Sequence, residues 1–210
     1  MREESRLQAS NSGGSEANAD ATLKLVIRVI DNVLERSANV NGDITYIASC
    51  TYWHSLMGVD AKGKPTSPVY GWADTQGREY TPVLKERFDE GKTHNRTGAH
   101  FHSSFWPAKL LWLKGRNPNG SEGVVFSNAS RWLSLGDYLT LKFCGKAVTS
   151  ISMASGTGIF DIRLCSWDDE LLRYLNLRKN ALPEIAPDGT AFSFLPLAAF
   201  GKCELFAADR

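Results

Sequence analysis

The sequence has no long apolar run and no excess of charge of either sign. A membrane-spanning helix needs about 20 consecutive apolar residues, and no stretch of this chain approaches that length. The chain has 24 basic and 23 acidic residues, which give a net charge of +1. This balance leaves no broad basic field that would attract nucleic acid or an anionic membrane. The composition therefore argues against nucleic-acid-binding and membrane-binding proteins.

Cysteine is sparse and widely spaced, and no secretion signal is visible. The spacing fits neither a zinc ribbon nor a C-x-x-C redox pair and is typical of reduced thiols in an intracellular protein. Residues 1–20 lack the apolar segment of a signal peptide, so a cytoplasmic location is predicted. The four cysteines are Cys50, Cys144, Cys165 and Cys203.

Several motifs that would indicate a particular chemistry are also missing. The stretch "SMASGTG" at 152–158 lacks the G-K-[ST] ending of a Walker loop and the spacing of a dinucleotide fingerprint. No G-x-S-x-G elbow for a serine nucleophile occurs. His100 and His102 could place two imidazoles on one face, but no third ligand is near in the sequence. No metal site is therefore predicted.

The chain has an ordinary globular composition, with 210 residues of which 42% are hydrophobic. That is enough for one sizeable domain. Residues 1–19 are polar and rich in Gly and Ser, which predicts disorder. From Asp20 to about residue 36, apolar residues recur at three- and four-residue steps and predict an amphipathic helix capped by Asp20. Residues 44–50, "ITYIASC", are almost continuously apolar and predict a buried strand.

The remainder of the chain alternates between helical and strand-like patterns. Two strands, 56–59 and 68–72, flank a turn and predict a hairpin. Alternation of this kind predicts an α/β fold, in which helices cover a sheet. A short strand is predicted at 124–127, and further helices are predicted at 79–91, within 105–115, at 134–145 where Gly145 provides the stop, and at 167–177.

Polar and aromatic side chains at strand ends suggest a site for a polar ligand. Trp53 and His54 follow strand 44–50, where ligands of open α/β sheets bind. Trp72 and Asp74 are two residues apart on the return strand and should share one side. An indole can cover the C–H face of a polyol while a carboxylate accepts hydroxyl protons. A surface aromatic with a capping histidine, or an ordinary strand-end pair, fits the same pattern, so both interpretations stay open.

Residues 148–162, "VTSISMASGTGIFDI", are crowded with Ser, Thr and Gly and then become strand-like. Such crowding is usually turn chemistry. The composition alone does not distinguish a loop that holds a ligand from a tight connection.

Four stretches in a fixed order resemble the FGGY family of carbohydrate kinases, in particular its gluconokinase- and xylulokinase-like members. They are "YWHSLMGVDAKGKP", "GWADT", "TGAHFHSSFWPAKLLWL" and "RWLSLGDYLTLKFCGKAVTSISMASGTGIFDIRLCSWDDELL". The resemblance extends from about residue 20 to about residue 183. It implies a ribonuclease-H-like fold of the actin and hexokinase type, with a central mixed sheet flanked by helices. Residues 20–200 would then be the amino-terminal, sugar-binding domain.

The resemblance also implies a reaction and a set of site residues. The family transfers the γ-phosphoryl group of ATP, with Mg²⁺, to a hydroxyl of a sugar, polyol or aldonate. Lys109 and Trp112 match the family's "K-x-x-W" helix, whose role is implied to be structural. The substrate-binding positions implied are Trp53, His54, Trp72, Asp74 and Ser104.

Three departures from the family pattern affect the expected activity. No Asp-x-Gly-Thr phosphate loop with its strands is recognisable before Asp20, and the ATP-binding domain expected after about residue 200 is missing. Ser150 stands where the family's "D-x-S-x-A" motif places the catalytic aspartate base. A serine hydroxyl is a poor proton acceptor. Asp161, the nearest carboxylate, lies at a position that is implied to be structural.

The sequence therefore predicts an incomplete carbohydrate kinase that is inactive alone, with the ATP domain absent or carried by a partner chain. A non-catalytic sugar-binding or regulatory module and a truncated gene product are the alternatives. The fold predicts that Trp53, His54, Trp72 and Asp74 line one depression near Ser150.

Overall fold

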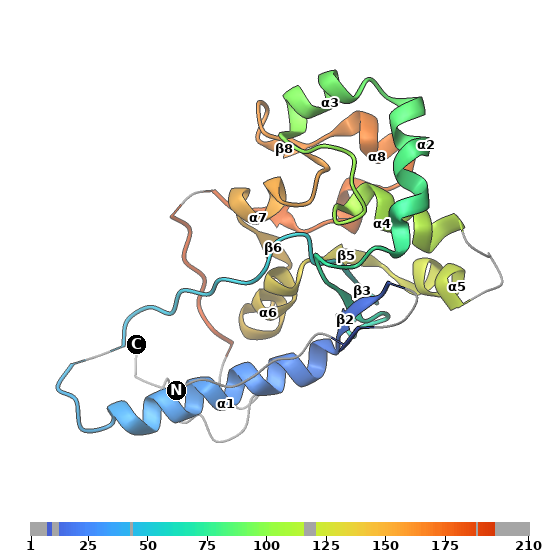
Figure 1. Cartoon of the computed structure of the whole chain (residues 1–210). Helices are drawn as coiled ribbons and strands as arrows, with labels where there is room; N and C mark the ends of the chain where they lie inside the picture. Colours follow the sequence, from blue (N-terminus) through green and yellow to red (C-terminus); the bar gives the residue numbers. More distant parts are fainter. Residues whose placement is uncertain (1–7, 10–12, 43, 116–120, 188, 196–210) are drawn as a thin grey trace.

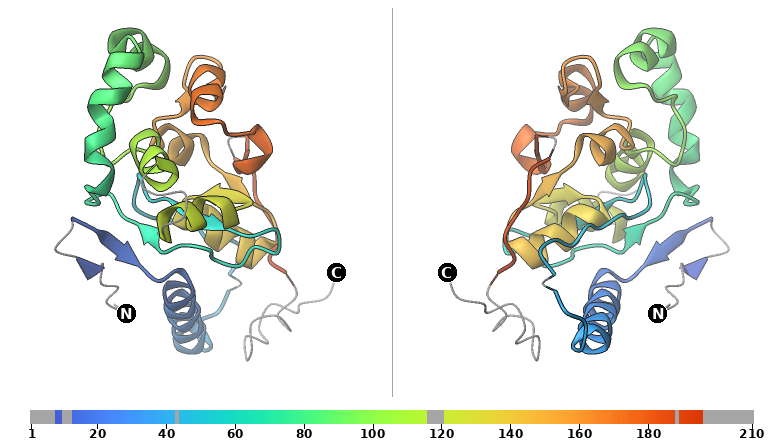
Figure 2. Two further views of the ribbon diagram at one scale, coloured as in Figure 1. Left: turned by 90° about the vertical axis from the view of Figure 1, so that its right-hand side faces the viewer. Right: turned by 90° about the vertical axis from the view of Figure 1, so that its left-hand side faces the viewer.

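The computed structural model describes residues 8–9, 13–42, 44–115, 121–187 and 189–195 (Figure 1). Helix α1, Ala19–Ser37, lies at one end of the molecule. Helices α2, Tyr80–Arg87, α3, Glu90–Thr97, and α8, Asp169–Leu175, gather at the other end, as two further views show (Figure 2). Short strands lie between the two ends. None of the helices in these ranges is long and apolar enough to cross a membrane.

Antiparallel pairing joins most of the strands. Strand β2, Ser15–Ala17, pairs with β1, Gln8–Ala9, and with β4, Val69–Tyr70. Strand β3, Met57–Val59, pairs with β5, Arg131–Leu133. Backbone hydrogen bonds in both directions between Leu56 and Tyr70 connect these two groups of strands. The predicted hairpin of 56–59 and 68–72 therefore exists as isolated bridges, while each strand finds its main partner elsewhere.

Two shorter pairs make the sheet structure mixed. Strand β6, Val148–Thr149, is parallel to β9, Glu184–Ile185. Strand β7, Phe160–Asp161, is antiparallel to β8, Ser166–Trp167. Segment 148–162 contains β6 and β7, one strand of each pair, and joins them through the short helix α7, Ile151–Ser155.

The remaining helices cover this framework. Helix α4, Trp106–Gly115, is buried along most of its length and carries large side chains of the main hydrophobic cluster, including Trp106 and Trp112. A Cβ at Gly77 would lie 2.8 Å from the backbone of Ala108, so only glycine allows this close approach. The other helical elements are η1, Gln76–Glu79, α5, Ser121–Asn128, α6, Leu135–Cys144, and η2, Lys179–Ala181.

The helices predicted from periodicity and caps are confirmed. Helix α6 begins after Ser134, whose hydroxyl accepts from the N–H of Asp137 while the carboxylate of Asp137 accepts from the N–H of Ser134. This reciprocal capping box satisfies two otherwise unpaired donors. Gly145 ends the same helix with φ 70°, the left-handed conformation that glycine adopts without strain. The predicted helix 79–91 is divided between η1, α2 and the start of α3.

The prediction of disorder for residues 1–19 is wrong for the segment around β2. Ser15 and Ala17 are buried, and β2 pairs with β4, which lies more than 50 residues later in the chain. Asn18, and not Asp20, caps α1 by accepting from the N–H of Ala21. Local composition carries no information about pairing with a distant strand, which is why the polar composition of this segment predicts disorder where the chain is ordered.

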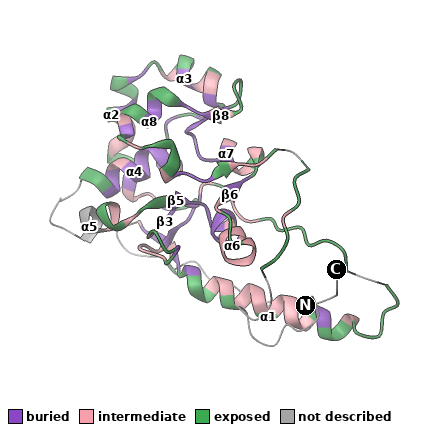
Figure 3. Ribbon diagram, turned by 180° about the vertical axis from the view of Figure 1, so that it is seen from behind, coloured by how far each residue is buried: buried purple, intermediate pink, exposed green. Residues whose placement is uncertain are grey.

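The predictions of a buried strand at 44–50 and of a strand at 124–127 are also wrong. Residues 44–50 are exposed, with Tyr46 80% accessible, and they pair with no other strand of the described chain (Figure 3). A strand requires a partner for its backbone donors and acceptors. Residues 124–127 belong to helix α5, which packs on α4 and brings Phe126 to 5.5 Å from the ring of Trp132. Packing overrides the weak β preference of the two valines.

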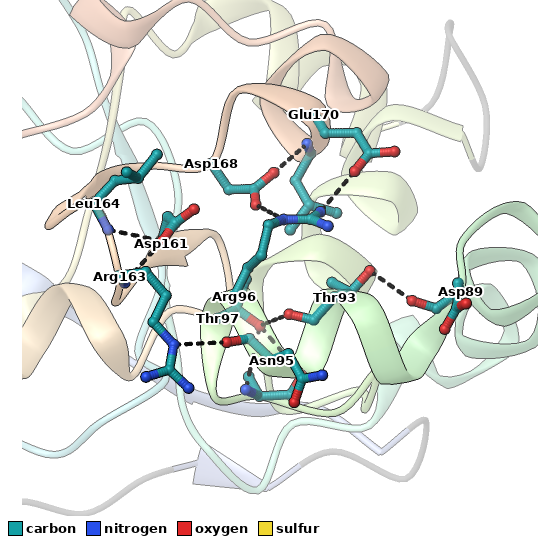
Figure 4. A network of polar contacts seen from close by, with 12 residues as sticks. Asp89, Thr93, Asn95, Arg96, Thr97, Asp161, Arg163, Leu164, Asp168 and Glu170 are labelled. Carbon is teal, nitrogen blue, oxygen red and sulfur yellow. Dashed lines mark hydrogen bonds and ion pairs between the residues drawn. The ribbon is translucent and has the colours of Figure 1, made fainter.

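An ion-pair network holds α3 against the start of α8 (Figure 4). Arg96 donates to Asp168 at 2.8 Å and to Glu170 at 2.6 Å, and Asp168 also caps α8 by accepting from the N–H of Leu171. The hydrogen bond that Arg96 donates to the carboxylate of Asp168 raises the pKa of the Arg96 guanidinium. This network fixes the β7–β8 region, because Ile162 donates its N–H to the carbonyl of Arg96.

Candidate functional site

His54 has a left-handed backbone at the turn before β3, with φ 64°. This conformation costs a non-glycine residue about 1 kcal/mol or more and persists only where surrounding contacts impose it. The Nδ1 atom of His54 lies 2.5 Å from the carbonyl oxygen of Gly156. A carbonyl only accepts, so Nδ1 carries the proton and Nε2 of the neutral ring is left as an acceptor.

The charge state of His54 follows from its surroundings. Burial lowers the pKa of the His54 imidazole, the Gly156 carbonyl opposes this, and the positive charge of Lys109 lowers the pKa further. The ring is therefore neutral at pH 7. A neutral imidazole with a free Nε2 is suited to accept a proton from a ligand hydroxyl.

Trp53 and His54 rest on the segment 148–162. The indole of Trp53 is 49% exposed, and a Cβ at Gly156 would lie 2.9 Å from its Cγ atom. The ring of Phe105 meets His54 edge to face at 4.4 Å between centroids. Three parts of the chain that are far apart in sequence therefore meet at this turn.

We predict that Gly156→Ala displaces Trp53 without unfolding the protein. Gly156 has φ −73°, which alanine accepts, so only the contact with the indole is violated. The tryptophan emission should shift, and the free energy of unfolding should change by less than about 1 kcal/mol, because the ring is half exposed. Gly91→Ala is the matched control, since a Cβ at Gly91 meets nothing closer than 3.4 Å. An unchanged emission, or the same shift in a Trp53→Phe background, would contradict the contact.

Ser104 lies in the loop before α4, beside His102. Its hydroxyl is 3.0 Å from Nδ1 of His102, and its N–H donates to the same atom at 3.2 Å. His100 instead stacks on His94 at 4.2 Å, so the two histidines of the His-x-His pair have different surroundings. No group of three or more His, Cys, Asp or Glu in the described ranges could hold a metal ion.

The buried Lys109 of α4 connects these segments. Its Nζ donates to the carbonyl oxygens of His54 at 2.8 Å, Gly71 at 2.7 Å and Ser104 at 2.8 Å. Trp106, one turn earlier on the same helix, donates its indole N–H to the carbonyl of Ser55 at 2.9 Å. Helix α4 therefore fixes the turn at His54 through two side chains.

Trp72 and Asp74 do not share a side, contrary to the prediction from strand alternation. Strand β4 ends at Tyr70, and the chain then turns. Trp72 is 56% exposed whereas Asp74 is fully buried. The carboxylate of Asp74 accepts from the N–H of Ser15 at 3.1 Å and from the backbone and side chain of Gln76 at 3.1 and 3.0 Å. Asp74 thus has three protein donors and joins β2 to η1.

Ser150 is the cap of α7. Its hydroxyl accepts from the N–H of Met153 at 3.1 Å, and the residue is exposed. Asp161 lies in the β7–β8 turn, where its Oδ1 atom accepts from the N–H groups of Arg163 and Leu164.

The structure brings together Trp53, His54 and the Ser104 loop. Trp72 is linked to them through the preceding residue, Gly71, whose carbonyl accepts from the same Lys109 ammonium as the carbonyls of His54 and Ser104. It adds Gly156 and Phe105, which sequence reasoning did not select. The sequence offered one sign that Lys109 is buried and bonded: it is a basic residue among the apolar side chains of α4. Lysine is almost never fully buried without partners. The contacts of Gly156 and Phe105 depend on tertiary packing and had no signal in the sequence.

Comparisons with known proteins agree with this architecture. Residues 1–198 match the model of the FGGY family of carbohydrate kinases, N-terminal domain. A gluconokinase of Bacillus subtilis is 22% identical over 178 residues, covering 85% of this chain and 33% of the relative. A xylulose kinase of Staphylococcus xylosus is 25% identical, covering 83% of this chain and 35% of the relative.

Solved structures confirm the predicted α/β fold. The crystal structure of gluconate kinase from Lactobacillus acidophilus superposes with a TM-score of 0.84 and 27% identity, covering 94% of this chain and 39% of that one. The fold is the ribonuclease-H-like type of actin and hexokinase. The chain spans about a third of the length of the curated relatives named here. With the family model matching nearly all of its residues, the chain belongs to the FGGY family of carbohydrate kinases.

Proposed function

We propose that this chain is the sugar-binding part of an ATP-dependent carbohydrate kinase, and that it does not transfer phosphate alone. Its ligand is a sugar, polyol or aldonate, one hydroxyl of which is phosphorylated in the assembled enzyme. The observation that carries the proposal is the meeting of His54 with Gly156, Phe105 and Lys109. These contacts place Trp53, His54 and the Ser104 loop beside the helix that Ser150 caps.

The side chains suit a polyhydroxylated ligand. An indole face covers the C–H groups of such a molecule, as Trp53 can do from its half-exposed position. The Nε2 atom of neutral His54 accepts a hydroxyl proton, and the hydroxyl of Ser104 adds a donor and acceptor. Phosphoryl transfer depends on holding the attacking hydroxyl in place, which is the task that these residues would perform.

ATP and Mg²⁺ belong to the proposed reaction through the family. Among the described residues, no group of three or more His, Cys, Asp or Glu side chains could hold a metal ion, and Ser150 offers no carboxylate. We propose that ATP and Mg²⁺ are bound mainly by other parts of the assembled kinase, in the same polypeptide or in a partner chain. No step through either cofactor is assigned to the described side chains.

Calorimetric titration of the chain with gluconate, xylulose and glycerol tests the proposal. We expect saturable binding of one or more of them, and no sugar-dependent consumption of ATP. Trp53→Ala should weaken binding by about tenfold, which corresponds to about 1.4 kcal/mol for a lost ring contact. Tyr46→Ala is the control, because Tyr46 is also an exposed aromatic but lies in segment 44–50. Equal losses in the two variants would argue against this site.

Ser150 favours a second candidate, a non-catalytic sugar-binding or regulatory module. Such a module would bind the same ligand through the same residues and would never phosphorylate it. Phosphorylation after the chain is combined with the remainder of a family kinase would exclude this candidate. Absence of any binding would instead favour a truncated gene product.

A further inference from the structure

Lys109 is fully buried, and its ammonium group has three carbonyl acceptors. The three carbonyls belong to the turn at His54, the turn after β4, and the loop before α4. The first two segments are also joined by the backbone hydrogen bonds between Leu56 and Tyr70, whereas Lys109 bonds to all three. An ammonium has three N–H donors and no acceptor, so the three carbonyls use its full donor capacity. Burial of a lysine without a directly bonded carboxylate is costly and requires such complete satisfaction.

Each of these three carbonyls lies at or next to a proposed ligand-contacting side chain. Two belong to His54 and Ser104 themselves, and the third belongs to Gly71, which precedes Trp72. One side chain thus bonds to the backbone at or next to three positions that the family resemblance assigns to the substrate site. Helix α4 is also bonded to segment 148–162, because the backbone N–H of Trp106 donates to the carbonyl of Thr157 at 2.9 Å.

We propose that Lys109 is a positioning residue of the sugar site and that only its ammonium form holds all three segments in place. The inference rests on the proposed function, because it assigns a role within that same site. Lys109 does not touch the ligand. It sets the spacing of Trp72, His54 and Ser104, and therefore the shape that the ligand meets.

The charge state of Lys109 makes this spacing sensitive to pH. Burial lowers the pKa of the Lys109 ammonium to about 7, although the negative charge of Asp74 opposes the shift. The other titratable group that faces it is His54, whose own pKa lies below the ordinary 6.5. A neutral amine has two N–H donors and a lone pair, so above this pH one carbonyl loses its donor. The three segments are then held less firmly.

The test uses the full chain labelled with 5-fluorotryptophan, which gives fluorine signals from its six tryptophans. Trp→Phe variants assign the signals of Trp53, Trp72 and Trp167. In Lys109→Met the first two should shift or broaden while that of Trp167 stays unchanged, and the affinity for the bound sugar should fall about tenfold or more. Lys114→Met is the matched control, since Lys114 is exposed on the same helix. Lys114→Met should change neither the fluorine signals nor the affinity for the sugar.

Titration of the unsubstituted chain from pH 6.5 to 8.5 gives a second readout that does not require a folded variant. The signals of Trp53 and Trp72 should move with a common midpoint near 7, and affinity should weaken over the same range. The pH midpoint of these fluorine signals should persist in His54→Gln, because this variant removes the neighbouring imidazole and leaves Lys109 as the titrating group. Signals that do not titrate above pH 6.5, or a folded Lys109→Met with unmoved signals, would overturn the inference. If the signals move but no sugar binds, the proposed function fails, and only the structural part of the inference stands: that the Lys109 ammonium holds the three segments together.

Discussion

Asp74→Ala is expected to lower the free energy of unfolding by about 3 kcal/mol, because three donors lose a buried acceptor and Lys109 loses its nearest negative charge. Asp74 is fully buried, so water cannot take the place of the carboxylate without local rearrangement. The loss should appear in denaturant unfolding as a lower midpoint with little change in slope. A carboxylate that merely contacted the ligand would show no such loss.

Two comparisons make this prediction specific. Glu86→Ala removes an exposed carboxylate on α2 and should change the free energy of unfolding by less than about 0.5 kcal/mol. Asp74→Asn keeps one acceptor oxygen but turns an amide toward the N–H groups of Ser15 or Gln76, so it should lie between the two alanine variants. A stable Asp74→Ala that has lost only sugar affinity would restore the substrate-binding role that the family resemblance implied.

The contrast between the helices and the strands shows how far the sequence could predict the fold. Both ends of helix α6 are marked by residues close in sequence, Ser134 and Asp137 at the start and Gly145 at the end, so the predicted helix is correct. Strand β2 depends on β4, and its polar sequence carries no sign of that partner. Segment 44–50 has the composition of a buried strand, but without a paired strand beside it the backbone stays exposed. Local signals therefore sufficed for helices with clear caps, such as α6, and failed where pairing or packing across the chain decides, as for β2 and for α5.

The candidate site shows the same division. The resemblance supplied Trp53 and His54, and the structure gives both a defined neighbour in Gly156. Alternation placed Trp72 and Asp74 together, but the turn after Tyr70 separates an exposed indole from a buried carboxylate. The contacts of Lys109 with three carbonyls could not be predicted, because backbone acceptors have no sequence signature.

Ser150→Asp is expected to raise phosphoryl transfer by about 100-fold or more once a phosphate loop and an ATP-binding domain are both supplied. A positioned general base contributes about 10² to 10⁴ in rate, and a serine hydroxyl cannot serve as one. The substitution should leave α7 intact, since aspartate caps helices as well as serine and can accept from the N–H of Met153 in the same way. The assay uses a chimera in which residues 20–195 replace the matching segment of the Bacillus subtilis gluconokinase and the rest of that kinase is kept on both sides, with gluconate as acceptor.

Ser150→Asn separates the two roles of this position in the same chimera. Asparagine caps α7 through its amide oxygen, but it has no basic carboxylate, so its rate should stay at the level of the serine form. Ser150→Ala should also stay inactive and should lose about 1 kcal/mol of stability with the cap. Equal rates for the aspartate and asparagine forms, in chimeras that bind gluconate equally well, would show that this position does not supply the base. A rate increase confined to aspartate would mean that the sugar site is intact and that the missing carboxylate at position 150 limits catalysis in the assembled chimera.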